Sequence, residues 1–268
     1  MFATRLISGI ILVVLALILV TTGGGVLFAA VAAISLIGMF ELYRVMKLEK
    51  TPLAAVGYLA AALYYGLVWF EKKDLMMLMA AAFVMVLMAI YVFTFPKYKT
   101  EEITITFFGV FYVAVMLSYL FLVRRVADGV YLVWLVFLSS WGCDTCAYCA
   151  GMLFGRHKLA PVLSPKKSIE GAIGGMVGAA LLGALYGAVF GAHMEEVGNP
   201  VIACCAACAI AAVISQIGDL AASAIKRNHQ VKDYGTLIPG HGGILDRFDS
   251  VIITAPVIYY LAKTILGI

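Results

Sequence analysis

The sequence has little charge and no long polar region. Of its 268 residues, 13% are Asp, Glu, Lys or Arg and 64% are hydrophobic, and the mean hydropathy is +1.03. A soluble globular domain is nearer a quarter charged and half apolar. The chain also lacks a long linker, a low-complexity tract and a tandem repeat. These absences argue against a soluble protein and against several separate domains, so we treat residues 1–268 as a single transmembrane domain.

Apolar stretches recur along nearly the whole chain. Each is close to the roughly 20 residues that a helix needs to cross about 30 Å of hydrocarbon. They predict an all-α integral membrane protein, a polytopic bundle of about nine transmembrane helices, at residues 6–22, 25–43, 52–70, 74–95, 103–123, 129–150, 171–192, 200–224 and 249–267. The first stretch resembles a signal peptide, but Thr21-Thr22-Gly23 is a poor cleavage site, so we expect a retained membrane helix.

The distribution of basic residues predicts the orientation. With the N-terminus in the cytoplasm, 14 of the 19 Lys and Arg residues lie in cytoplasmic segments. The other side keeps only Lys72, Lys73, Arg124, Arg125 and Lys263. By the positive-inside rule, we expect the two longest polar segments, near 151–170 and 227–246, to face the cytoplasm. The membrane is expected to be the cell (inner) membrane. The net charge of +4 needs no nucleic-acid partner, because basic residues beside membrane helices explain it.

Several chemical signatures are missing. The sequence contains no G-x-x-x-x-G-K-[ST] nucleotide-binding loop and no evident activated Ser or Cys nucleophile. Cys143, Cys146 and Cys149 share one arc of an apolar helix without an obvious fourth ligand. We expect these thiols to pack as small apolar groups rather than to bind a metal.

The two halves of the chain differ in polarity: the apolar stretches of the first half contain few polar residues, whereas the second half carries acidic residues inside or at the edge of its stretches. Residues 1–130 are expected to be mainly scaffold helices, whereas residues 131–268 carry the catalytic motifs. Asp219 lies on a polar stripe with Ser215, Ser223 and Lys226. One interpretation is a buried Asp219–Lys226 pair. The other is a row of carboxylate and hydroxyl groups that leads to a cytoplasmic site, with Lys226 and Arg227 at its mouth.

A glycine-rich segment, residues 232–250, follows this stripe. Gly240, Gly242 and Gly243 would let backbone N–H groups approach an anion, and the last predicted helix begins immediately afterwards. The N-terminus of a helix favours phosphate. Asp246 and Asp249 are three residues apart, so their carboxylates could share one face of the first turn.

The third element begins at Asp144, near the end of the sixth apolar stretch. Asp144, Tyr148 and Gly151 share a helix face, and Lys166-Lys167 lie in the loop that follows. Backbone N–H groups at the next helix, which begins near Ser168, would offer another place for phosphate. Carboxylates suit Mg²⁺ together with substrate phosphates, and cationic side chains suit a polyphosphate. The pattern therefore indicates metal-assisted phosphoryl or nucleotidyl transfer at a membrane surface.

The run from Ser223 to Asp249 resembles the signature of the phosphatidate cytidylyltransferase (CDP-diglyceride synthase) family, S-x-x-K-R-x-x-x-x-K-D-x-G-x-x-x-P-G-H-G-G-x-x-D-R-x-D, at every fixed position. The Trp141-x-x-Asp144 and Ser164-Pro165-Lys166-Lys167 segments also resemble the family, and Ser168 departs mildly from a more usual Thr. The resemblance implies CTP and phosphatidic acid as substrates, a requirement for Mg²⁺, a homodimer and a cytoplasm-facing cavity. The crowded carboxylates leave room for a second cation. CDP-diacylglycerol and pyrophosphate would be the products.

The residue assignments follow from the motifs and the resemblance together. Asp219 and Asp246 are expected to bind metal, with Asp144 and Asp249 as further candidates. The expected catalytic residues are Asp219, Asp246, Lys167 and Arg247. The expected substrate-binding residues are Lys166, Ser223, Lys226, Arg227, Lys232, Asp233, Gly240, His241, Gly242 and Gly243. A CTP-dependent lipid kinase and a transporter of an anionic solute are the alternatives.

Overall fold

The computed structural model describes the backbone of residues 2–264 and the side chains of residues 7–263. The first four helices are α1 (Phe2–Thr22), α2 (Gly24–Val45), α3 (Pro52–Trp69) and α4 (Asp74–Thr94). Two long helical segments follow, each containing a π-helical insert: α5 (Thr100–Gly109), η1 (Val110–Val115) and α6 (Met116–Arg124), then α7 (Gly129–Phe137), η2 (Leu138–Gly142) and α8 (Cys143–Phe154). The chain ends with α9 (Ile169–Phe190), η3 (Gly191–His193), α10 (Pro200–Asn228) and α11 (Leu245–Thr264).

The helices confirm a polytopic α-helical membrane protein. Within the described residues, seven helical stretches are long and apolar enough to cross a membrane, and Ile7–Thr22 is a shorter apolar helix. Helix α11 has Asp246, Arg247 and Asp249 in its first two turns, so it is less apolar than these seven. The predicted boundaries agree to within a few residues, the main difference being that α11 begins at Leu245 rather than at 249.

Local sequence signals explain several helix starts. Thr51 caps α3 by accepting a hydrogen bond from the Ala54 N–H at 3.3 Å, and Pro52 occupies the first helical position. Asn199 caps α10 in the same way, accepting from the Ile202 N–H at 3.2 Å, ahead of Pro200. A side-chain acceptor followed by proline is a strong start signal, because proline needs no N–H partner there.

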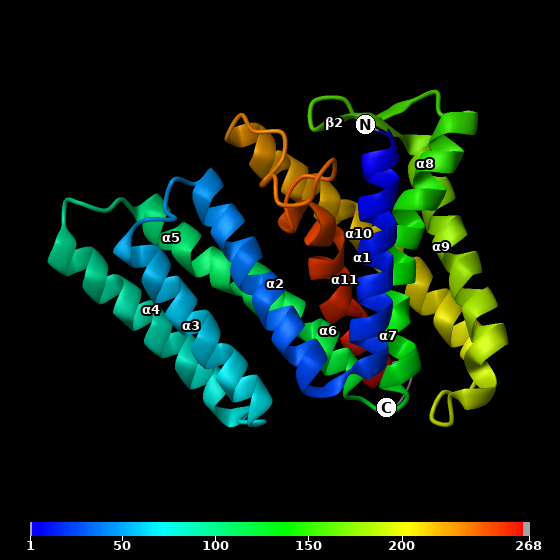
Figure 1. Cartoon of the computed structure of the whole chain (residues 1–268), viewed down its shortest axis with the longest axis horizontal. Helices are drawn as coiled ribbons and strands as arrows, with labels where there is room; N and C mark the ends of the chain where they lie inside the picture. The colour runs from blue at the N-terminus through cyan, green and yellow to red at the C-terminus, as the bar shows by residue number, and fades with distance from the viewer. Residues whose placement is uncertain (1, 265–268) are drawn as a thin grey trace.

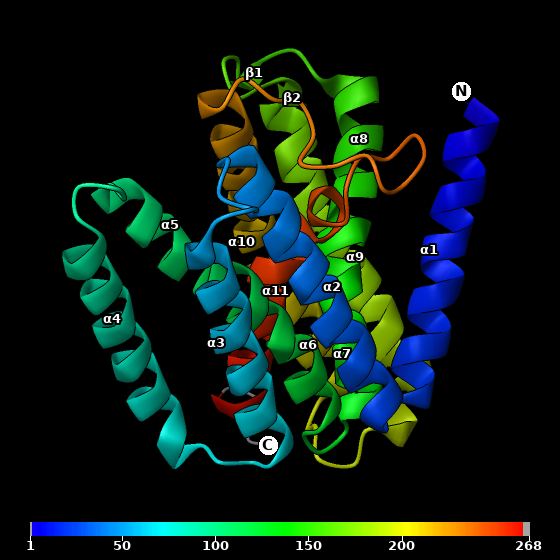
Figure 2. The ribbon, with the colours of Figure 1, turned by 60° about the vertical axis from the view of Figure 1, so that its left-hand side comes forward.

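The helices run alternately up and down, so every second connection lies at the same end of the molecule (Figure 1). The N-terminus, the loop between α8 and α9, and the loop between α10 and α11 all lie at that end. The connections between α1 and α2, α3 and α4, and α9 and α10 lie at the opposite end. Figure 2 shows α1 standing apart from the rest of the bundle beside α2 and α7. The two polar segments that carry the sequence motifs therefore lie on the same side of the protein.

The loop after α8 is more ordered than the sequence predicts. Strands β1 (Lys158–Ala160) and β2 (Ser164–Ser168) form a short antiparallel hairpin, with Lys158 opposite Ser168 and Ala160 opposite Ser164. The hairpin is the only pair of strands among the described residues, apart from an isolated antiparallel bridge between Ile238 and Gly242. It matters for the site because it holds Lys166 and Lys167 in an extended segment beside α8 and α10.

Candidate active site

A cavity of about 450 Å³ opens beside the β hairpin. Helix α8 contributes Asp144, Tyr148 and Gly151, the three residues that share a helix face in the sequence. Strand β2 contributes Lys166 and Lys167. Helix α10 adds Gln216 and Asp219 from the polar stripe. The structure thus brings together two of the three sequence motifs at one cavity.

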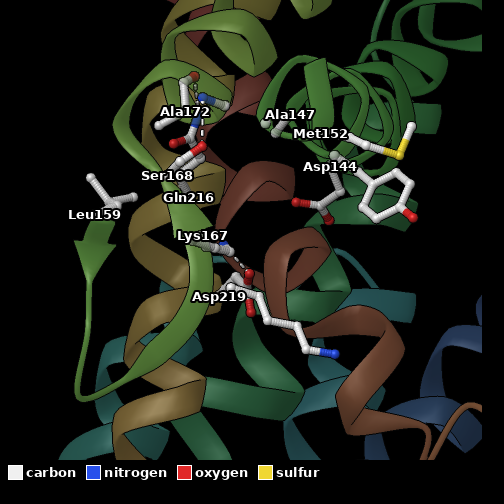
Figure 3. A pocket seen from close by; sticks show the side chains of 13 residues that line it. Asp144, Ala147, Met152, Leu159, Lys167, Ser168, Ala172, Gln216 and Asp219 are labelled. Atoms are coloured by element: carbon white, nitrogen blue, oxygen red, sulfur yellow. Dashed lines mark hydrogen bonds and ion pairs between the residues drawn. The ribbon is translucent and has the colours of Figure 1, made fainter. Parts of the chain in front are cut away.

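Opposite charges meet across this cavity. Lys167 Nζ forms an ion pair with Asp219 Oδ2, and both side chains are partly exposed. The Asp144 carboxylate faces the same space from α8 (Figure 3). Gln216 donates from Nε2 to the Ala172 carbonyl at 2.9 Å, which ties α10 to α9 below the charged groups. A residue of an accessible ion pair can exchange its partner for a charged ligand. Separating a fully buried pair costs more free energy, because it leaves an uncompensated buried charge.

A third acidic side chain, Asp249, lies near the two cavity carboxylates. It is buried on α11 and does not line the cavity itself, and the charged groups around it include Asp219, Lys226 and Asp144. Within residues 7–263, however, no three His, Cys, Asp or Glu side chains converge into a ready metal cage. Magnesium ordinarily takes one or two protein carboxylates and completes its shell with water and substrate phosphates. Asp144 and Asp219 fit that pattern, because both border the open cavity.

Asp246, the other primary metal candidate, has a different environment. Its Oδ1 accepts from Lys226 Nζ at 2.8 Å, and its Oδ2 accepts from the Tyr234 and Gly243 N–H groups at 2.8 and 2.9 Å. The side chain is buried, and both of its oxygens have protein partners. The assignment of Asp246 to metal stays a prediction. Its contacts connect α10, through Lys226, with both ends of the glycine-rich loop at Tyr234 and Gly243, so it stabilises that loop.

The same contacts argue against a buried Asp219–Lys226 pair, one of the two interpretations of the sequence. The Lys226 amine pairs with Asp246, and the Asp219 carboxylate pairs with Lys167. The two residues on the stripe therefore turn to different partners. Ser215, one turn before Asp219, is fully buried, and its Oγ has no hydrogen-bond partner among the described residues. Ser223 is half-buried, and Arg227 at the end of α10 donates from Nε to the Leu163 carbonyl at 3.4 Å.

The glycine-rich loop forms a second hollow, of about 530 Å³. Its charged and glycine lining residues include Lys232, Asp233, Gly240, His241, Gly242 and Arg247. Gly240 and Gly242 have φ angles of 76° and 84°, which side-chain-bearing residues rarely adopt, so glycine is needed at both positions. Arg247 Nε is buried and has no hydrogen-bond partner within the described part of the chain. A buried guanidinium nitrogen without a partner is the kind of donor that an anion would satisfy.

The N-terminus of α11 is not free to bind phosphate as the sequence predicted. Glu41 of α2 is buried, and its carboxylate accepts from the Ile244 N–H at 3.1 Å and from the Leu245 N–H at 2.8 Å. The Gly243 N–H is already used by Asp246. Carboxylates of the protein itself therefore occupy these amides, and phosphate must rely more on side-chain cations. The correction arises because a residue 203 positions away caps the helix, which local pattern cannot reveal.

Helix α2 makes a second contact with the loop. Arg44 donates from a guanidinium nitrogen to the Tyr234 carbonyl at 2.8 Å. The Tyr234 ring is fully buried and its hydroxyl donates to the Ala222 carbonyl at 3.1 Å. Burial raises the pKa of Tyr234 far above its ordinary value, so the phenol remains a neutral donor. A Cβ at Gly235 or Gly243 would collide with the Glu41 carboxylate. Glu41 and Arg44 thus fix the path of the loop from α2, which belongs to the part of the chain expected to be mainly scaffold.

The start of α9 is closed in a similar way. Ser168 accepts from the Gly171 N–H at 3.1 Å, and Glu170 accepts from the Arg156 N–H at 3.0 Å. Glu170 also bonds His157 Nδ1 at 2.6 Å. Because the Gly171 N–H already donates to Ser168, the N-terminus of α9 has fewer free backbone donors for phosphate than the sequence predicted. The cations Lys166 and Lys167 remain the better phosphate partners at this cavity.

Carboxylates beside accessible cations, at one end of a helical membrane bundle, define a membrane-embedded enzyme that handles phosphate groups. Known sequences narrow this class. The sequence profile of the Cytidylyltransferase family matches residues 3–265. A Bacillus subtilis protein named phosphatidate cytidylyltransferase is 30% identical over 265 residues, covering 96% of both chains. A Staphylococcus aureus protein of the same name is 31% identical over 262 residues, covering 96% of this chain and 97% of the relative. The chain belongs to the cytidylyltransferase family.

Proposed function

We infer that the protein transfers the cytidylyl group of CTP to phosphatidic acid, giving CDP-diacylglycerol and pyrophosphate in phospholipid biosynthesis. Family membership and the names of the relatives carry the identity of the reaction. The observation in the fold that supports it is the cavity in which Asp144 and Asp219 lie opposite Lys166 and Lys167. Such an arrangement suits two anionic substrates that must approach each other.

The proposed reaction is an in-line displacement at phosphorus. A phosphate oxygen of phosphatidic acid forms a bond to the α-phosphorus of CTP, and the bond from that phosphorus to the bridging oxygen of pyrophosphate breaks. The nucleophile is already an anion, so the protein need not supply a strong base. Its main task is to offset the repulsion between two groups of negative charge.

The described side chains suggest how this repulsion is reduced. Lys166 and Lys167 would contact phosphate at the cavity, and Arg247 and Lys232 would contact it at the adjacent hollow. Binding of phosphate by Lys167 would release the Asp219 carboxylate from its ion pair. Asp144 and Asp219 would then hold Mg²⁺, which supplies charge neutralisation to the phosphates when it is bound. Asp249 is the remaining acidic group within reach of a second cation.

The membrane topology is also part of the proposal. We propose nine membrane crossings, adding α1 and α11 to the seven qualifying stretches, with the N-terminus and both motif loops in the cytoplasm of an inner-membrane protein. The excess of basic residues at this end supports the orientation. Single cysteines at Lys158 and Lys232, in a background without the six native cysteines, should be labelled from the cytoplasmic side. Labelling of either loop only from the other side would reverse the orientation.

The decisive experiment for the reaction follows the phosphorus atoms of CTP. Purified protein, phosphatidic acid and Mg²⁺ are incubated with CTP labelled in either the α- or the γ-phosphate. Cytidylyl transfer moves only the α label into lipid and releases pyrophosphate. Entry of the γ label would indicate a lipid kinase, and solute movement without any transfer would indicate a transporter. The homodimer implied by the family resemblance is a separate proposal, tested by the mass of the detergent-solubilised protein.

A further inference from the structure

An apolar crevice of about 290 Å³ lies between α1 and the rest of the bundle. Helix α1 forms one wall with residues such as Leu12, Ala16 and Leu19, and α2 forms the other with residues such as Ala30 and Ile34. Every lining residue is apolar.

The crevice borders the charged hollow of the candidate active site at the start of α11. Ile244 and Phe248, on either side of the start of α11, line the crevice, whereas Arg247 lines the charged hollow. Residues 244 and 248 are four apart and share a face, while Arg247 points about 100° away from Phe248. Trp141 also lines the crevice, and its Nε1 donates to the Arg247 carbonyl at 3.1 Å. The residues at the start of α11 therefore line two neighbouring openings, one apolar and one charged.

We propose that this crevice binds an acyl chain of the phosphatidic acid substrate while the lipid phosphate lies toward Arg247. The assignment rests on the proposed cytidylyl transfer and adds to it the place where the lipid binds. An apolar chain joined to a phosphate is the chemistry that matches an apolar crevice joined to a cationic hollow. Arg247 lines the charged hollow beside the crevice, and the phosphate end would lie toward this cation.

The length of the crevice fits one leaflet of a bilayer. Along α1 it extends from Leu12 to Val20, about 12 Å at the rise of an α-helix. Half of the hydrocarbon thickness is about 15 Å. The crevice begins one turn after Ser8, whose Oγ lies 2.7 Å from His241 Nδ1 in the glycine-rich loop. An acyl chain in this position would run from the site into the leaflet on the loop side of the membrane.

The proposal predicts a chain-length effect when the crevice is filled. Ala16→Phe and Ala30→Phe add a ring from opposite walls. For dioleoyl phosphatidic acid, kcat/KM should fall about tenfold, the loss expected when about two methylenes leave their apolar contacts. For dihexanoyl phosphatidic acid the change should be less than about twofold, because a short chain fills little of the crevice. Ala81→Phe, an exposed position on α4, is the matched control and should affect neither lipid. Equal losses for both lipids, or no loss for either, would overturn the assignment.

A binding measurement separates this assignment from the reaction itself. Phosphatidic acid with a diazirine in one acyl chain is photolysed with the full-length protein, and labelled peptides are identified by mass spectrometry. Labelling within 12–20 and 27–34 supports the crevice even if no cytidylyl transfer is detected. Cytidylyl transfer without labelling there would refute the crevice and leave the reaction intact. Equal labelling by a diazirine phosphatidylcholine would identify an ordinary lipid-facing groove and refute the substrate site.

Discussion

Removing the Glu41 carboxylate should both destabilise the protein and stop catalysis. Glu41 is 3% exposed and accepts the Ile244 and Leu245 N–H groups at 3.1 and 2.8 Å. In Glu41→Ala both amides lose their partner in a buried environment. Hydrogen bonds to a charged group contribute about 1.5–3 kcal/mol each, so the expected loss for two of them is about 3–6 kcal/mol. Glu41→Gln can still accept one of the two bonds and should lose about half as much.

The effect should reach the reaction because α11 carries Arg247 two residues after the second of these amides. Without the cap, the first turn of α11 and the loop before it lose their fixed position. We expect Glu41→Ala to reduce kcat strongly even in the fraction that survives mild heating, with Glu41→Gln retaining intermediate activity. Misplacement of a positioning group by about 1 Å can cost about a hundredfold in rate.

The assay combines the midpoint of thermal inactivation in detergent with steady-state rates at saturating CTP. Glu195→Gln, in the exposed loop at the opposite end of the molecule, is the matched control for loss of one glutamate charge. It should behave like the parent protein. If Glu41→Ala kept the parent midpoint and rate, then the α11 amides would not depend on α2, and the account of the loop would be refuted.

Three further substitutions test the separate roles of the charged residues in metal binding, stability and substrate binding. Asp219→Asn should leave the fold intact and lower activity about 100-fold or more, since Asn is a poorer ligand for Mg²⁺, and near-parent rates in a Mg²⁺ titration would contradict this. Asp246→Asn should lower the free energy of unfolding by about 3 kcal/mol because the buried Lys226 loses its counter-ion, an effect measured by thermal inactivation and absent if the pair is dispensable. Lys167→Gln should raise the KM for CTP about tenfold through the loss of a charge-assisted phosphate contact, and an unchanged KM would remove Lys167 from the binding site.

The membrane helices could be predicted well because a bilayer imposes a length on every crossing. Apolar stretches of the required length, bounded by signals such as Thr51-Pro52 and Asn199-Pro200, leave little freedom in where a helix begins. The common face of Asp144, Tyr148 and Gly151 was likewise predictable from helical periodicity, and all three line the same cavity. These features depend on residues close in sequence. The β hairpin was missed because its strands are only three and five residues long.

Partner choice among charged residues was not predictable in the same way. Asp219 and Lys226 lie on one helix face, yet Lys167 and Asp246 reach them from other elements. Glu41 did carry a usable signal, because it is an acidic residue near the end of an otherwise apolar stretch. Ionisable groups at such depth face a partner or a cavity, a rule that applies to the first half of the chain as well as to the second. Its partners, two backbone amides in α11, could be identified only from the folded chain.

The carboxylates Glu41 and Asp246 give the loop a shape that does not depend on substrate. Between them they satisfy four backbone or side-chain donors around the start of α11 and a fifth at Tyr234. If phosphate had to satisfy these donors, the loop would lose its hydrogen bonds each time product left. Because the protein supplies permanent anions there, the exchangeable contacts fall to cations that border the two openings, such as Lys167 and Arg247. A site preorganised by fixed carboxylates and completed by cations at these openings can bind polyanions and release them without refolding.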